Sequence, residues 1–303
     1  MRIALPAFLL AVVLVFPGLV PNAPGHLGSL TETALPWFGL GVPLLLMWAA
    51  ARRSLKGAVA VLAPALAWTV VFGPAVAAGQ GSGRPDFQAL TLNVGGDRTA
   101  PGDVAREVKA IGADVVTLQK VPRPAMRAYE EALRAAYPHH VASDTIGLWS
   151  RYPLRDVERL GLGGAWPHAI RAVARTPGGD AAVYAVRLPS VRVGVTKGFA
   201  VAQRDASAAR LAERVARDPT PRVLLLGDLN GSLRDRGLAP LTHGLRSTQE
   251  GAGHGLGFTW PAAFPVVRID HVLVRGLEPT GTRVLPDLGS DHRPVLTGLR
   301  GGG

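Results

Sequence analysis

The chain has 303 residues, which is long enough for one large domain or two ordinary ones. Its formal net charge of +11 comes largely from arginines interspersed with acidic residues, as in residues 204–217, and this spread favours a generally basic surface over a dedicated nucleic-acid-binding stripe. The absence of cysteine excludes disulfides, zinc–thiolate sites and a cysteine nucleophile.

The first third of the chain is strongly apolar. Residues 3–20, 35–51 and 57–78 form three stretches without a charged side chain, each near the ~20 residues that a helix needs to cross ~30 Å of hydrocarbon. We therefore expect a membrane region, residues 1–79, with three transmembrane helices. The alternative for the first stretch is a cleaved signal peptide, but no small-x-small cleavage site follows it and two more apolar stretches come after it.

The charges beside these stretches predict their orientation. Arg52, Arg53 and Lys56 lie between the second and third stretches, whereas the first loop carries only Glu32. Basic loops stay on the cytoplasmic side, and Arg2 would lie there too. Three crossings then leave the rest of the chain outside, so we expect a multi-pass protein of the cell membrane with an extracytoplasmic C-terminal domain.

A Gly-rich linker, residues 80–85, separates the membrane region from a domain that we place at residues 86–300. Apolar periodicity predicts strands at residues 87–94, 114–118, 146–149, 170–175, 181–188, 222–226, 266–274 and 281–284, and helices at residues 104–111, 123–136 and 202–217. Many strands interleaved with few helices predict an α+β fold in which sheets pack on each other and helices lie outside.

Polar side chains follow several of these strands, where loops held by a rigid sheet can bring them to one cleft. They are Asn93, Asp228, Asn230, Asp270 and Asp291. Asp228 and Asn230 lie two residues apart after a buried strand, so their side chains would face the same way. Taken singly, such residues are also compatible with ordinary turn or capping chemistry.

Five motifs in order carry a resemblance to a known family. They are Thr91-Leu92-Asn93-Val94, Trp149-Ser150-Arg151-Tyr152-Pro153-Leu154, Gly227-Asp228-Leu229-Asn230, Arg268-Ile269-Asp270-His271 and Ser290-Asp291-His292-Arg293-Pro294. In order and spacing they resemble the endonuclease/exonuclease/phosphatase superfamily. The resemblance implies a four-layer α/β/β/α sandwich of the deoxyribonuclease I type over residues 86–300, preceded here by three transmembrane helices.

The same resemblance implies roles for individual residues. His292 would contact a phosphate and be oriented by Asp270, Asp228 would act as the base or orient the water, and Asn230 would hold phosphate or water. Attack of water on a phosphoryl group needs a base and neutralisation of charge on the phosphoryl oxygens, which suits these residue types.

The resemblance also implies a magnesium site, beside which Asn93 and Asp291 would lie. Lys120 stands where the family has its principal glutamate ligand, and Arg187 stands where it has a histidine. Three interpretations remain open: loss of the metal site and of activity, replacement of the metal's charge by the Lys120 and Arg187 cations, or weak metal binding by the remaining carboxylates.

Membrane-tethered bacterial members of this superfamily, including the teicoplanin-resistance type, have a similar layout. That similarity favours hydrolysis of a lipid-linked phosphate or pyrophosphate at the outer leaflet, with a phosphorylated lipid or other phosphoester as substrate and the membrane as partner. A nuclease or other phosphodiesterase is one alternative, although nucleic acid is less favoured. A noncatalytic protein that binds a phosphorylated ligand is the other.

Overall fold

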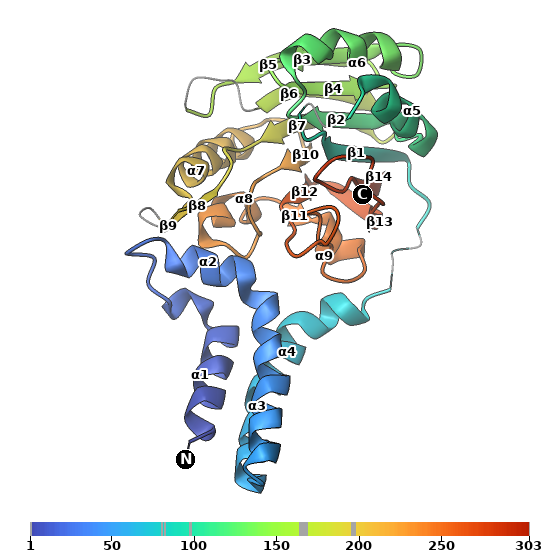
Figure 1. Cartoon of the computed structure of the whole chain (residues 1–303). Helices are drawn as coiled ribbons and strands as arrows, with labels where there is room; N and C mark the ends of the chain where they lie inside the picture. Colours follow the sequence, from blue (N-terminus) through green and yellow to red (C-terminus); the bar gives the residue numbers. More distant parts are fainter. Residues whose placement is uncertain are drawn as a thin grey trace.

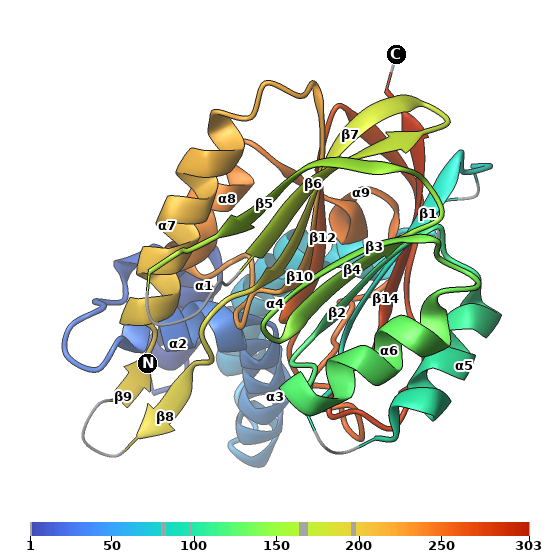
Figure 2. The same ribbon diagram turned by 90° about the horizontal axis from the view of Figure 1, so that it is seen from above.

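The structure is a computed structural model that describes residues 2–79, 81, 83–96, 99–163, 169–194 and 198–302. Figure 1 shows N-terminal helices that project below a larger unit of strands and helices. Seen from above in Figure 2, that unit has two facing sheets with helices on both outer sides.

The N-terminal region is helical throughout most of its length. Its elements are α1 (Ala4–Val15), η1 (Pro17–Leu19), α2 (Leu27–Ala34), η2 (Leu35–Leu40), α3 (Gly41–Ala51) and α4 (Leu55–Ala77). Helix α1 ends before Phe16 because a residue that precedes proline is disfavoured in the helical conformation; Phe16 has φ −125° and ψ 58°. Ser54 caps the N-terminus of α4, where its hydroxyl accepts a hydrogen bond from the N–H of Gly57.

Two helical segments of the described chain are long and apolar enough to cross a membrane: Leu27–Ala51, which joins α2, η2 and α3, and Leu55–Ala77. The predicted third span is not confirmed, because α1 has 12 residues and covers only ~18 Å of the ~30 Å hydrocarbon layer. Of the 23 large apolar side chains that are exposed in the described residues, 20 lie between Leu5 and Val76, and this concentration suits contact with lipid.

Two six-stranded sheets form the rest of the molecule. The first has the order β13 (Leu277–Val284), β14 (Val295–Gly301), β1 (Phe87–Asn93), β2 (Val115–Gln119), β4 (Ile146–Ser150), β3 (His139–Ser143). The second has the order β11 (Arg246–Ser247), β12 (Asp270–Arg275), β10 (Arg222–Asp228), β7 (Gly179–Arg187), β6 (Ala169–Thr176), β5 (Leu154–Leu160). A short hairpin of β8 (Arg192–Gly194) and β9 (Gly198–Ala200) lies beside them.

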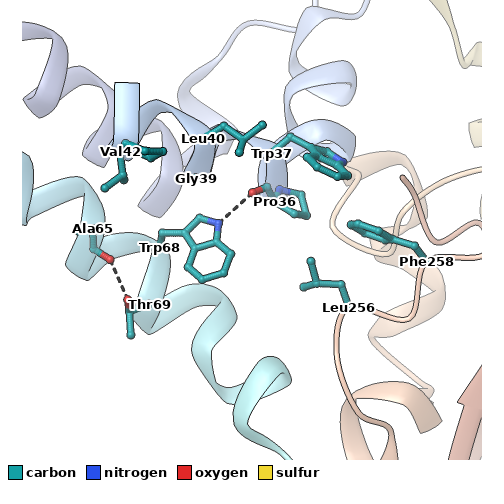
Figure 3. Close-up of a pocket in the computed structure, with 11 residues that line it drawn as sticks. Pro36, Trp37, Gly39, Leu40, Val42, Ala65, Trp68, Thr69, Leu256 and Phe258 are labelled. Atoms are coloured by element: carbon teal, nitrogen blue, oxygen red, sulfur yellow. Dashed lines mark hydrogen bonds between the residues drawn. The ribbon is translucent and has the colours of Figure 1, made fainter. Parts of the chain in front are cut away.

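The sandwich rests on the N-terminal helices through specific polar contacts. Glu32 of α2 is 4% exposed; it accepts a hydrogen bond from the backbone N–H of Arg236 at 2.8 Å and pairs with the Arg236 guanidinium at 2.9 Å. The indole N–H of Trp37 donates to the carbonyl of Val266 at 2.7 Å, and its ring stacks on Phe258 (Figure 3). These contacts fix the loops after β10 and before β12 against the apolar helices.

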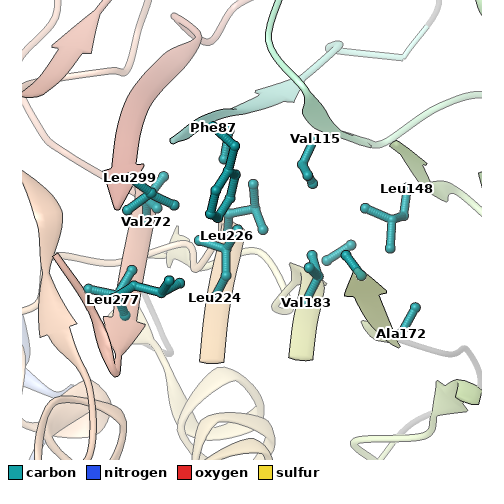
Figure 4. Close-up of a cluster of buried hydrophobic side chains, with 14 of the residues drawn as sticks. Phe87, Val115, Leu148, Ala172, Val183, Leu224, Leu226, Val272, Leu277 and Leu299 are labelled. Atoms are coloured by element: carbon teal, nitrogen blue, oxygen red, sulfur yellow. The ribbon is translucent and has the colours of Figure 1, made fainter. Parts of the chain in front are cut away.

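Three buried clusters give the sandwich its layers. The central cluster lies between the sheets and includes Phe87, Val115, Leu148, Val183, Leu224 and Leu299 (Figure 4). Helices α5 (Pro101–Ile111) and α6 (Met126–Leu133) cover the first sheet, and α7 (Ala202–Ala216) and α8 (Ala239–Thr242) cover the second. The predicted four-layer α/β/β/α sandwich is therefore confirmed.

Several elements differ from the sequence prediction. Strands β3, β5, β8, β9, β11 and β14, and helices α8 and α9 (Thr248–Ala252), were not predicted. Strand β5 lies at a sheet edge and is largely exposed, so it lacks the apolar alternation that reveals a half-buried strand. The interior of β14 contains Gly298, which weakens a strand pattern. The predicted helix 123–136 divides into η3 (Arg123–Ala125) and α6.

Candidate active site

Asp228 lies at the carboxyl end of β10, where neighbouring strands bring two other predicted residues beside it. In the parallel pairing of β10 with β7, Asp228 stands opposite Arg187, and in the antiparallel pairing with β12 it stands opposite Asp270. Paired residues on adjacent strands project from the same face of a sheet. The fold therefore places these three charged side chains together at one end of the sandwich.

Gly227 allows this close approach of strands just before Asp228. Its φ is +151°, and a Cβ built on it would lie 1.8 Å from the carbonyl oxygen of Val186 in β7. Any larger residue would have to push β7 and β10 apart at the site. The glycine of the Gly227–Asn230 motif is thus required by backbone packing.

A buried hydrogen-bond network holds Asp228. Its Oδ2 accepts from the side-chain amide of Asn93 at 2.8 Å, across the gap between the two sheets, and from that of Asn230 at 3.0 Å. Its Oδ1 accepts from the backbone N–H of Asn230 at 2.9 Å. The Asn230 amide also donates to the carbonyl of Leu188 at 2.8 Å, so Asn230, which has φ +51°, is fixed in one orientation.

His292 and Asp270 form the second half of the site. The Nδ1 of His292 lies 2.9 Å from Oδ2 and 3.2 Å from Oδ1 of Asp270, and both side chains are almost fully buried. The hydroxyl of Ser290 accepts from the backbone N–H of His292 and donates to the carbonyl of Asn93 at 2.6 Å. The Oγ1 of Thr259 accepts a hydrogen bond from the backbone N–H of Asp270 at 3.3 Å.

The charges in the site shift the protonation of both halves. Burial, followed by repulsion from Asp270, raises the pKa of Asp228 to about 6. Burial by itself would lower the pKa of His292, but the carboxylates of Asp270, Asp228 and Asp291 outweigh it and hold that pKa above its ordinary value. A carboxyl group with a pKa near neutrality beside an imidazole that holds its proton more tightly than usual is a pairing suited to acid–base chemistry.

Donor groups suited to a divalent cation are also present. Ligand atoms of Asp228, Asp270 and His292 lie within 4.8 Å of one another and form a possible metal site. The Oδ1 of Asp291 is buried without a hydrogen-bond partner in the described residues, and such an orphaned oxygen is one that a cation would satisfy. The Oδ1 of Asn93 accepts from the N–H of Gly95, which leaves one lone pair.

The two residues that depart from the family pattern lie differently. Arg187 faces the cluster, where its charge lowers the pKa of Asp228 against the larger raising effects; one of its guanidinium nitrogens donates to Ser190 at 3.3 Å. Lys120, with φ +56°, directly follows β2, and its Cε lies beside Gly96. No described residue of the cluster forms a hydrogen bond or ion pair with Lys120, so its catalytic role stays a prediction.

Sequence reasoning did not assign roles to three polar side chains that shape the site. Thr259 and Ser290 accept hydrogen bonds from the backbone N–H groups of Asp270 and His292, and Ser290 belongs to one of the five motifs. Gln119 is fully buried; its amide donates to Thr91 and Thr117, and its Oε1 has no partner in the described chain. The position of Gln119 at the end of an apolar strand was the sequence signal that could have identified it.

One family of known proteins matches most of this domain. Residues 90–292 match the endonuclease/exonuclease/phosphatase family. The chain belongs to this family. Its members are mostly hydrolases of phosphoester bonds, so the site described above is that of a phosphoesterase fold. No curated protein matches the chain.

Several solved structures share the fold. A functionally unknown conserved protein from Enterococcus faecalis V583 has a TM-score of 0.59 at 16% identity, over 71% of this chain and 99% of that chain. The family member from Beutenbergia cavernae has a TM-score of 0.57 at 21% identity, over 73% and 72%. The mannosyl-6-phosphatase from Bacteroides thetaiotaomicron has a TM-score of 0.57 at 16% identity, over 71% and 99%.

The arrangement can support attack of water on a phosphoryl group. Asp228 has the pKa and the buried setting of a group that accepts a proton near neutral pH. Arg187, and His292 when its imidazole is protonated, would supply positive charge for phosphoryl oxygens, with Asp270 orienting the His292 ring. A divalent metal held by the carboxylates would add Lewis-acid stabilisation of the same charge.

Proposed function

We propose that the chain is a membrane-anchored hydrolase that cleaves a phosphoester or pyrophosphate bond of a lipid-linked phosphate at the outer face of the membrane. The observation that carries this proposal is the attachment of the site to the apolar helices. Asp228 and Asn230 are followed by the loop that Arg236 ties to Glu32, and Asp270 is preceded by the loop that bonds Trp37.

Two exposed aromatic side chains support the same substrate class. Trp260 and Phe264 are 39% and 72% exposed and lie on the loop that leads to Val266, whose carbonyl accepts the hydrogen bond of Trp37 in η2. Aromatic side chains are enriched at membrane–water interfaces, where one end is apolar and the other wet. The active site would then lie at the level of lipid head groups, where nucleic acid has poor access.

A second candidate function is noncatalytic binding of a phosphorylated ligand. It is favoured by Lys120, which places a cation where the family resemblance calls for a carboxylate ligand. In that case the hydrogen bonds of Asp228 would stabilise the shape of a binding pocket, and the chain would hydrolyse no phosphoester.

One assay distinguishes the hydrolase from the binding protein. Phosphate release from a polyprenyl pyrophosphate is measured for the full chain in detergent, once with Mg²⁺ and once with a chelator. Turnover that disappears in Asp228→Ala but persists in Asp103→Ala, an exposed acid on α5 that pairs with Arg106, supports the hydrolase. Absence of turnover with any phosphoester, together with turnover gained by the double change Lys120→Glu and Arg187→His, supports the binding protein.

A further inference from the structure

An apolar cavity of about 400 Å³ lies where the N-terminal helices meet the sandwich (Figure 3). Its walls include Pro36, Trp37, Leu40, Trp68, Leu256 and Phe258. The indole N–H of Trp68 donates to the carbonyl of Pro36 at 2.9 Å, and that of Trp37 is bonded to Val266. Neither indole needs a polar ligand, so the cavity suits a hydrocarbon chain of a size that ligand pockets commonly hold.

A smaller cavity of about 210 Å³ adjoins the first and carries charge. The two share the walls Pro36, Leu256 and Phe258. In the smaller cavity, Arg268 pairs with Glu250 at 3.2 Å, while Arg234 stacks over Phe72 at 4.7 Å and donates to the carbonyl of Val71 at 3.2 Å. The lining of this cavity therefore contains two guanidinium groups and one carboxylate.

The charge balance of this smaller cavity favours an anion. Arg234 forms no salt bridge with any described residue, and Glu250 neutralises only one of the two cations. Burial lowers the pKa of Arg234 and of Arg268, and Glu250 offsets that effect only in part. A desolvated cation without a full counter-charge gains from binding an anionic group.

The two cavities follow each other along α4 in the order of the parts of a lipid. Three residues of α4 line the apolar cavity: Ala65, Trp68 and Thr69. Residues further along the chain line the charged cavity, nearer the sandwich: Val71, Phe72, Pro74 and Ala75 of α4, and Ala78 just after it. The helix rises ~1.5 Å per residue, so the charged cavity lies closer to the end of the span than the apolar one. A lipid of the surrounding leaflet has its chain and head in this order.

We propose that this junction is a binding site for an anionic phospholipid of the bilayer, with one acyl chain in the apolar cavity and the phosphate on Arg234 and Arg268. The site does not depend on turnover at Asp228. Bound lipid would brace the loops that carry Ser232 and Val267, which line the charged cavity and flank the active-site strands.

Tryptophan quenching tests the proposal, because Trp37 and Trp68 line the apolar cavity. The full chain in detergent is titrated with phosphatidylglycerol or phosphatidylcholine, each brominated in the acyl chains. Ala65→Phe fills the apolar cavity, so the quenching that this variant loses is the part caused by lipid bound in the cavity. Ala63 is exposed on the same helix, and Ala63→Phe is the control. We expect phosphatidylglycerol to reach half of the maximal quenching at a mole fraction about fivefold lower than phosphatidylcholine does.

Arg234→Gln should remove the preference for phosphatidylglycerol and leave quenching by phosphatidylcholine unchanged. Arg246→Gln, which breaks an exposed ion pair with Glu278, should change neither. Should Arg234→Gln fail to fold, the head-group preference of the unmodified chain decides alone. Equal quenching by the two lipids, or quenching unaltered by Ala65→Phe, would overturn the proposal. Displacement by polyprenyl phosphate at a far lower mole fraction would also overturn it, because the occupant would then be an isoprenoid lipid.

Discussion

Replacement of Gly227 by alanine should destabilise the sandwich strongly at the active-site end. The new methyl group would lie 1.8 Å from the carbonyl oxygen of Val186, a backbone atom that cannot move without β7, and the residue would have to keep φ at +151°. Strained backbone costs about 1–3 kcal/mol and overpacking about 1–3 kcal/mol more. The expected loss is therefore about 2–6 kcal/mol of unfolding free energy.

Thermal unfolding of the full chain in detergent measures this loss. A domain of this size loses about 2–4 °C in melting temperature per kcal/mol, so a mid-range loss lowers it by roughly 8–16 °C. Gly102→Ala is the matched control: nothing lies within 4 Å of its new methyl group in α5, and its melting temperature should stay the same or rise slightly. A Gly227→Ala protein that melts with the unmodified chain would refute the packing argument.

Three further changes probe the site and its attachment. Asp270→Asn should lower the pKa of His292, which is read from the ¹⁵N signals of its ring. The raised pKa of His292 contributes stability that is present below pH 6.5 and is lost as the pH rises through the pKa of the folded protein. The stabilities of the unmodified chain and of Asp270→Asn should therefore differ most at acid pH. An unchanged titration would contradict the pairing. Glu32→Gln should cost about 1.5–3 kcal/mol by uncoupling Arg236 from α2, seen as a lower melting temperature. Thr259→Val should cost about 1–3 kcal/mol, because the N–H of Asp270 loses its acceptor; an unaltered melting temperature would show that water replaces it.

Local sequence patterns predicted the parts of the site that lie on strands. Apolar residues 222–226 followed by Asp228 and Asn230 predicted a buried strand with polar side chains at its end, and the structure has β10 there. Asn93 and Asp270 likewise fall at strand ends and come together with Asp228. Periodicity fixes which way neighbouring side chains face, so these predictions needed no knowledge of distant parts of the chain.

Contacts between distant residues could not be predicted in the same way. Glu32 looked like a lone charge in a short loop, yet it is buried against Arg236, 204 residues away. The span predicted for residues 3–20 ignored the restriction that Pro17 places on Phe16. The position of Lys120 beside Gly96 depends on the left-handed turn after β2, which no apolar pattern reveals.

Substrate preference tests the central claim most directly. Hydrolysis by the full chain in detergent is compared at equal Mg²⁺ for three substrates. Phosphate release is measured for a polyprenyl pyrophosphate and for a soluble short-chain pyrophosphate ester, and strand cleavage is measured for DNA. The proposed function predicts that kcat/KM is highest for the lipid-linked substrate and that Asp228→Ala abolishes it. Preference for DNA or for the soluble ester, or equal turnover by Asp228→Ala, would contradict the account.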